Sequence, residues 1–174
     1  YIQEWEQEQH VRDARIAQIY EGANGIQSLD LLLRKVIMDQ GVVLFAWLEE
    51  MRAEVMQYSK TKQHCKALWL QGVSDFEHIT QRSMGQSIDW VNANACHYLS
   101  ALGYLTYGYL WLKMAEVAAN KTGCHTESKS FCEEKDNTSQ FYFEYIWPRI
   151  YGFFHILNHG SDTVFHHYHP VSQS

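Results

Sequence analysis

The sequence predicts an all-α protein, built as an antiparallel bundle of long helices. Apolar residues make up 46% of the 174 residues, which is a globular composition. Apolar side chains recur at helical spacing over long stretches, and no alternating run of β-branched residues bounded by hairpin turns occurs. Only two prolines interrupt the chain, so long helices are sterically allowed.

The individual helices follow from this periodicity. Helices are expected over residues 3–18, from near Gln27 to Val36, and over 42–58, 63–85, 87–119 and 139–158. Asp39-Gln40-Gly41 predicts a helix stop with the glycine past the end. Pro148 should kink the last helix or start a new helical segment. Residues 120–138 lose all periodicity and are expected to be a mobile surface loop.

Charge and composition exclude several classes of protein. The net charge of -6, without a basic cluster, argues against a nucleic-acid surface. The stretch Ala95–Leu112 has no Asp, Glu, Lys or Arg and approaches the length of a membrane span. Its glycines, tyrosines and His97 fit a buried bundle helix better, so no membrane contact is expected.

The cysteines and histidines do not form a metal motif. No two of the four cysteines are spaced as Cys-x-x-Cys, so a zinc knuckle is not expected. Scattered thiols indicate a reduced, cytoplasmic protein, with a Cys124–Cys132 disulfide left open. His155 and His159 could share one helical face, but no acidic partner pattern accompanies them. We therefore expect no metal site.

The stretch from Arg12 to Val36 is the most informative part of the chain. A helix ends at Ile19-Tyr20, the carboxylate of Glu21 follows at once, and two glycines come next. Apolar neighbours could desolvate this carboxylate, which would raise its pKa and make it a better general base. The alternative is a solvated glutamate beside a glycine turn, and physical chemistry alone favours that alternative.

The same stretch resembles the motif of the acyl-CoA dehydrogenase family. The matching residues are Arg12-Asp13-Ala14-Arg15-Ile16, Ile19-Tyr20-Glu21-Gly22 and Ile26-Gln27. The resemblance implies that Glu21 removes the α-proton of an acyl-CoA thioester while FAD accepts the β-hydrogen as hydride. It also implies that Tyr20 and Gly22 line the acyl pocket and that Ala23, Asn24 and Gly25 approach the FAD through their backbone. The family usually has Thr at the position of Ala23, so a hydroxyl that could bond the cofactor is missing.

Asn24-Gly25 and the rest of the chain resemble a longer subgroup that includes the methylmercaptopropionyl-CoA dehydrogenases. Members of this subgroup carry an extra C-terminal helical domain, which residues Tyr98–Ala115 and Phe141–Arg149 resemble here. The implied division places the end of the dehydrogenase helical domain in 1–40 and the appended bundle in 41–174.

The resemblance also sets expectations for activity and partners. The full-length parent would oxidise an acyl-CoA to the trans-2-enoyl-CoA, form a homodimer or tetramer, and pass electrons to an electron-transfer flavoprotein. The chain alone should be inactive, because such enzymes hold most of the flavin and the CoA with upstream domains. The alternative is a noncatalytic helical interaction or oligomerisation module that keeps the motif by descent.

Overall fold

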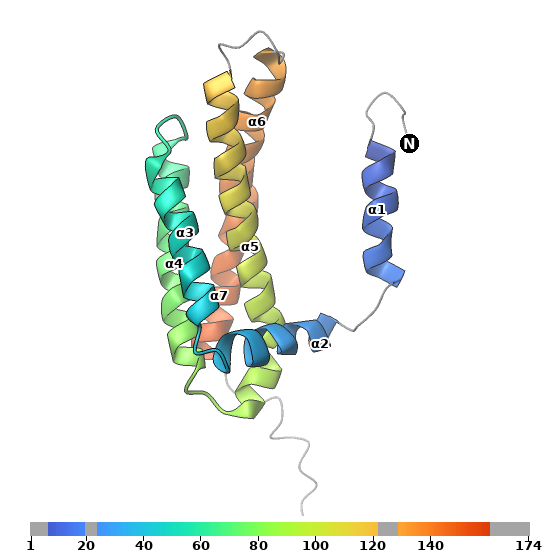
Figure 1. The fold of residues 1–174 in the computed structure, drawn as a ribbon, viewed down its shortest axis with the longest axis vertical. Helices are drawn as coiled ribbons and strands as arrows, with labels where there is room; N and C mark the ends of the chain where they lie inside the picture. The colour runs from blue at the N-terminus through green and yellow to red at the C-terminus, as the bar shows by residue number, and fades with distance from the viewer. Residues whose placement is uncertain (1–6, 20–23, 122–128, 161–174) are drawn as a thin grey trace, which may run out of the picture.

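The computed structural model of the chain describes residues 7–19, 24–121 and 129–160, which form helices joined by short turns and contain no strand. The predicted all-α bundle is confirmed. Figure 1 shows α3 to α7 side by side as an upright bundle, with α2 across its lower end and α1 apart from it. The elements in chain order are α1 (Gln7–Ile19), α2 (Asn24–Leu29), the π-helical η2 (Asp30–Ile37), α3 (Val42–Gln57), α4 (Gln63–Ser83), α5 (Ile88–Lys121), α6 (Lys129–Phe141), the π-helical η3 (Tyr142–Ile146), the 3-10 turn η4 (Trp147–Arg149) and α7 (Ile150–His159).

The turn at Gly41 ends the first packed helix and starts α3. Gly41 has a φ of 71°, a left-handed conformation that glycine adopts without a Cβ penalty. Its amide donates to the carbonyl of Val36 at 2.8 Å, so the predicted stop is confirmed. The helix before it begins at Asn24, earlier than expected near Gln27. Packing of α2 against α5 outweighs the poor helix propensity of Gly25.

The predicted apolar faces form the core of the bundle. The buried side chains are Leu44, Leu48, Met51 and Val55 on α3, Trp69, Val73 and Phe76 on α4, and Tyr98, Leu105 and Leu112 on α5. Each set follows the spacing of one helical face. Within the described ranges, no helix is both long enough and apolar enough to cross a membrane.

The indole of Trp147 fills a notch that two glycines leave between α4 and α5. Trp147 is fully buried. An ideal Cβ on Gly72 would lie 2.5 Å from its Cζ2 atom, and one on Gly108 would lie 2.9 Å from its Cζ3 atom. The ring therefore occupies the volume that a side chain would need at either position, and it ties the last helical segment to the middle of the bundle.

The expectation of a loop over 120–138 was wrong where the structure describes these residues. Asn120 and Lys121 extend α5, and Lys129–Thr138 lie in α6. This polar segment lacks a clear apolar period, but it packs along α5 and buries Cys132 and Ser139. Tertiary contact thus stabilises a helix that periodicity does not indicate. Cys124, one half of the disulfide left open above, lies in residues 122–128 outside the described ranges, and Cys132 is a free thiol.

Pro148 interrupts the last helical segment, as predicted. It lies in η4, between the π-helical turn η3 and α7. Proline has no amide to donate and its ring crowds the preceding turn, so a regular α-helix cannot run through this position. The break allows Trp147 and Ile150, both fully buried, to face the core on either side of the proline.

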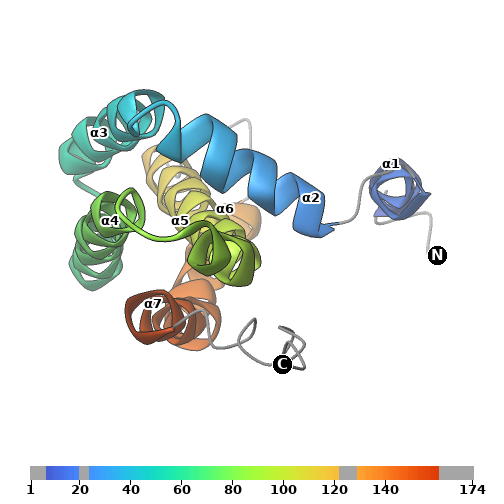
Figure 2. The ribbon, with the colours of Figure 1, turned by 90° about the horizontal axis from the view of Figure 1, so that it is seen from below.

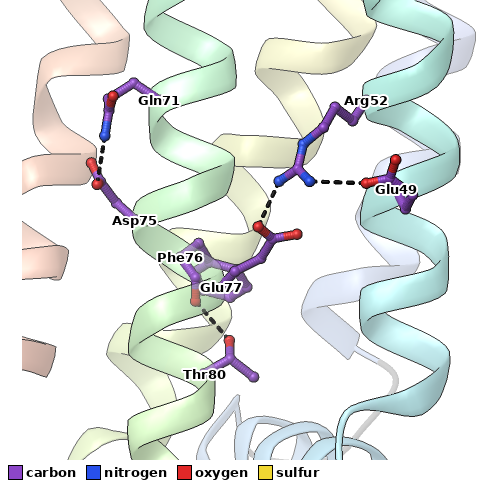
Figure 3. A network of polar contacts seen from close by, with 7 residues as sticks. All are labelled: Glu49, Arg52, Gln71, Asp75, Phe76, Glu77 and Thr80. Atoms are coloured by element: carbon purple, nitrogen blue, oxygen red, sulfur yellow. Dashed lines mark hydrogen bonds and ion pairs between the residues drawn. The ribbon is translucent and has the colours of Figure 1, made fainter.

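Polar side chains link neighbouring helices at the surface of the bundle. Figure 3 shows the Arg52 guanidinium of α3 between two carboxylates, with Nη1 2.9 Å from Glu49 and Nη2 2.5 Å from Glu77 of α4. In the last turn of α4, Arg82 donates to the carbonyls of Leu157 and Asn158 and so caps α7. These bonds fix the register of α4 against its two neighbours.

Candidate functional site

The predicted catalytic base, Glu21, lies outside the described residues, as do Tyr20, Gly22 and Ala23. The structure describes the helices on either side of this segment, α1 before it and α2 after it. Of the predicted site residues it therefore places Asn24 and Gly25.

The helix before the segment, α1, carries its polar contacts within itself. The Gln9 amide donates to Asp13 at 2.7 Å, and Arg12 donates to Gln9 at 2.7 Å. Its apolar residues Val11 and Ile16 are 40% and 59% exposed. Local bonds of this kind stabilise a helix only weakly, and the exposed side chains of Val11 and Ile16 remain available for packing.

The helix after the segment starts at Asn24, which is exposed, followed by the half-buried Gly25. An ideal Cβ on Gly25 would meet no atom within 4 Å, so the space beside this residue is open. Ser28 is buried and its hydroxyl donates to the Asn24 carbonyl at 2.7 Å, which holds the first turn. Gly25 fits a cofactor that approaches the main chain here, since no atom of the described residues lies within 4 Å of its Cβ position.

Glu54 is the centre of a polar cluster between α3 and α5. The Tyr109 hydroxyl donates to it at 2.5 Å, the Tyr58 hydroxyl at 2.7 Å, and Lys113 Nζ lies 3.0 Å away. The hydrogen bonds from Tyr109 and Tyr58, with help from Lys113, lower the pKa of Glu54 to about 2. A carboxylate that is such a stable anion is a poor proton acceptor at neutral pH, so Glu54 serves structure and is no candidate base.

Glu116 holds the link between α3 and α4. Glu116 is buried, and its carboxylate accepts backbone N–H bonds from Ser59, Lys60 and Thr61 at 3.2, 2.9 and 2.8 Å. The Thr61 hydroxyl donates to it as well, at 3.0 Å. Burial raises the pKa of Glu116, but these hydrogen bonds outweigh it and the pKa is lowered overall. The anionic Glu116 thus satisfies the free backbone amides of the link that leads into α4.

Histidines and acids do not converge in the described part of the chain. No group of three or more His, Cys, Asp or Glu residues there could hold a metal ion. His155 and His159 do share one face of α7, with ring centroids 4.7 Å apart.

Two comparisons with known proteins bear on this arrangement of helices. The sequence model of a family described as acetyl-CoA dehydrogenase C-terminal like matches residues 45–167, from α3 to beyond α7. The chain therefore belongs to this family. The broad-specificity linear acyl-CoA dehydrogenase FadE5 of Mycobacterium tuberculosis (strain ATCC 25618 / H37Rv) is 27% identical over 164 residues. The alignment covers 86% of this chain and 27% of FadE5, so the chain spans about a quarter of the length of that relative.

The family resemblance drawn from the sequence is thus confirmed for the chain as an acyl-CoA dehydrogenase C-terminal part. The roles of Glu21, of its neighbours and of Asn24 and Gly25 stay predictions. Sequence reasoning missed the structural roles of Glu54 and Glu116. Their partners Tyr109 and Thr61 lie 55 residues away in each case, so no local spacing signals these contacts.

Proposed function

We propose that this chain is the C-terminal part of an FAD-dependent acyl-CoA dehydrogenase, with Glu21 as the base that removes the α-proton. The full-length enzyme would convert an acyl-CoA thioester to the trans-2-enoyl-CoA. The observation that carries the proposal is the position of the Arg12–Gln27 motif directly before a bundle of the acyl-CoA dehydrogenase C-terminal family. FadE5 aligns with most of the chain, and its name describes a linear acyl-CoA dehydrogenase, which supports acyl-CoA as the substrate class.

The residues around Glu21 have distinct roles in this proposal. The Glu21 carboxylate takes the proton from the α-carbon, and Tyr20 and Gly22 line the acyl pocket. The backbone of Ala23, Asn24 and Gly25 approaches the cofactor, and the open space beside Gly25 supports this role. FAD supplies, when bound, the acceptor for the β-hydrogen and its electron pair.

The proposed domain organisation divides the chain near Gly41. Residues 1–40 end the dehydrogenase helical domain, and residues 41–174 form the appended bundle of the longer subgroup. The start of the family match at residue 45 and the left-handed turn at Gly41 support this division. The proposal includes a homo-oligomeric, cytoplasmic parent that passes electrons to an electron-transfer flavoprotein, and a chain that is inactive alone.

The second candidate is a noncatalytic helical interaction module. Its support is the bundle itself, where hydrogen bonds hold the carboxylates of Glu54 and Glu116 in structural roles. In this reading the motif persists by descent and Glu21 does no chemistry.

Replacing Glu21 by glutamine in the full-length enzyme separates the two candidates. The amide keeps the size of the side chain but cannot accept the proton, so we expect kcat to fall by roughly 10²–10⁴-fold with flavin content unchanged. Glu8→Gln, on α1, is the matched control and should keep normal turnover, because among the described residues Glu8 pairs with Arg12 one helical turn away. Unchanged turnover in Glu21→Gln would support the noncatalytic module.

A further inference from the structure

The charge-free stretch Ala95–Leu112 of α5 exposes apolar side chains on the side that faces away from the core. Its core face is buried, yet four large apolar side chains on the other side, the last of them just beyond this stretch, are exposed at intervals of eight, three and seven residues. Leu99 is 36% exposed, Tyr107 62%, Leu110 41% and Val117 45%. A helix that is apolar all round is normally covered on all sides. The exposed apolar side of Ala95–Leu112 is therefore a candidate interface.

The exposed stripe continues into two hollows between α5 and the segment that follows it in the bundle. One hollow of about 430 Å³ is lined by Met114, Val117 and Phe131, among others, with lysines at its edge. A second of about 350 Å³ is lined by Gly103, Tyr107 and residues of η3. Exposed apolar surface that extends over neighbouring helices is typical of an interaction site. We call this surface, from Leu99 to Val117 with both hollows, the α5 face.

The position of α1 indicates what could cover the α5 face. The helix α2 packs across α5 and carries the polypeptide towards α1. In Figures 1 and 2, α1 stands on the side of α5 that faces away from α3 and α4. The exposed Val11 and Ile16 of α1 also offer apolar surface. A single protein domain that packs between α1 and α5 would cover the exposed apolar side chains of both helices.

We infer that the α5 face is the surface on which the preceding dehydrogenase part of the same polypeptide packs. The inference rests on the proposed function, which makes residues 1–40 the end of that part. The alignment with FadE5 leaves about three quarters of that relative unmatched, which is ample chain to cover the face. A domain that is joined covalently through α2 is held at high effective concentration beside α5. This favours it over a second copy of the protein as the occupant of the α5 face.

Cysteine labelling of the full-length protein tests this surface. Leu110→Cys places a thiol on the α5 face, and Val117→Cys is a second probe should the first variant fold poorly. Met56→Cys is the matched control, because Met56 is 59% exposed on α3. Peptide mass spectrometry reads each site apart from the native cysteines. We expect maleimide to react at residue 110 at least about tenfold more slowly than at residue 56, with equal rates after denaturation.

A photo-crosslinker attached to Leu110→Cys identifies what covers the thiol. Crosslinks that keep the mass of one chain in denaturing electrophoresis, and that map to residues before this sequence, would support the inference. Crosslinks that double the mass would assign the α5 face to a second copy and overturn it, as would labelling as fast as at Met56→Cys. Neither readout needs turnover, so the docking surface and the role of Glu21 can fail independently.

Discussion

Alanine at Gly72 or Gly108 should destabilise the bundle, whereas alanine at Gly103 should stabilise it. A Cβ on Gly72 would approach Trp147 Cζ2 to 2.5 Å, and a Cβ on Gly108 would approach both Trp147 and Trp69 to 2.9 Å. Each of these indole rings is fully buried, so neither can move aside cheaply. Gly103 also lies in α5, but a Cβ there would meet nothing within 4 Å.

The expected free energies follow from two opposing effects. Replacing a glycine inside a helix by alanine stabilises by about 0.5–1 kcal/mol, through propensity alone. Overpacking a rigid core costs about 1–3 kcal/mol. Gly72→Ala should therefore lower the free energy of unfolding by roughly 1–2 kcal/mol. Gly103→Ala should raise it by about 0.5–1 kcal/mol, so the two variants should differ by about 1.5–3 kcal/mol.

Urea unfolding of the chain, followed by circular dichroism, measures these differences as shifts in midpoint at constant slope. Tryptophan fluorescence should report the same midpoints if unfolding is two-state. Equal stability of Gly72→Ala and Gly103→Ala would refute the packing of Trp147 into the glycine notch.

Three further predictions concern the capping groups and the cofactor. Glu116→Gln should destabilise by about 1–3 kcal/mol at neutral pH, because the amide loses a charge-assisted acceptor. Since the pKa of Glu116 is lowered on folding, its contribution is present above the unfolded pKa and is lost as pH falls through the folded one. The gap to wild type in urea unfolding should therefore shrink in acid, and a constant gap would contradict the ionised role. Lys66→Met should cost about 1–3 kcal/mol, because Lys66 Nζ caps α3 by donating to the carbonyls of Met56 and Tyr58 at 2.8 and 3.1 Å. The exposed Lys62→Met is its control, and equal losses in thermal melts would argue against the cap. The purified chain should show no visible flavin absorbance, and stoichiometric flavin bands would contradict the expectation that upstream domains are needed.

The helices that could be predicted from the sequence are those with a strong apolar period. Leu44, Leu48, Met51 and Val55 repeat on one face of α3, and all four are buried. The polar helix α6 could not be predicted, because its stability comes from packing on α5 and not from its own pattern. Pro148 and Gly41 were informative because each restricts or permits a backbone conformation locally.

Contacts between distant segments were beyond the reach of sequence reasoning. The fit of Trp147 between two glycines joins three helical segments, and no spacing along the chain indicates it. The same holds for the anchoring of Ser59–Thr61 by Glu116. For the candidate site the situation is reversed. The motif around Glu21 is a local pattern, so its resemblance to the acyl-CoA dehydrogenases could be identified from about a dozen residues. The family match covers residues 45–167 and confirms the family for the rest of the chain, while the role of Glu21 stays a prediction.

Anaerobic reduction of the bound flavin tests the assignment of Glu21 most directly. The full-length enzyme and its Glu21→Gln variant are each mixed with an acyl-CoA, and the visible flavin absorbance is followed over time. If Glu21 is the base, the wild-type flavin bleaches, whereas the variant retains its flavin and bleaches slower by roughly 10²–10⁴-fold. Bleaching of the variant at the wild-type rate would remove Glu21 from the reaction.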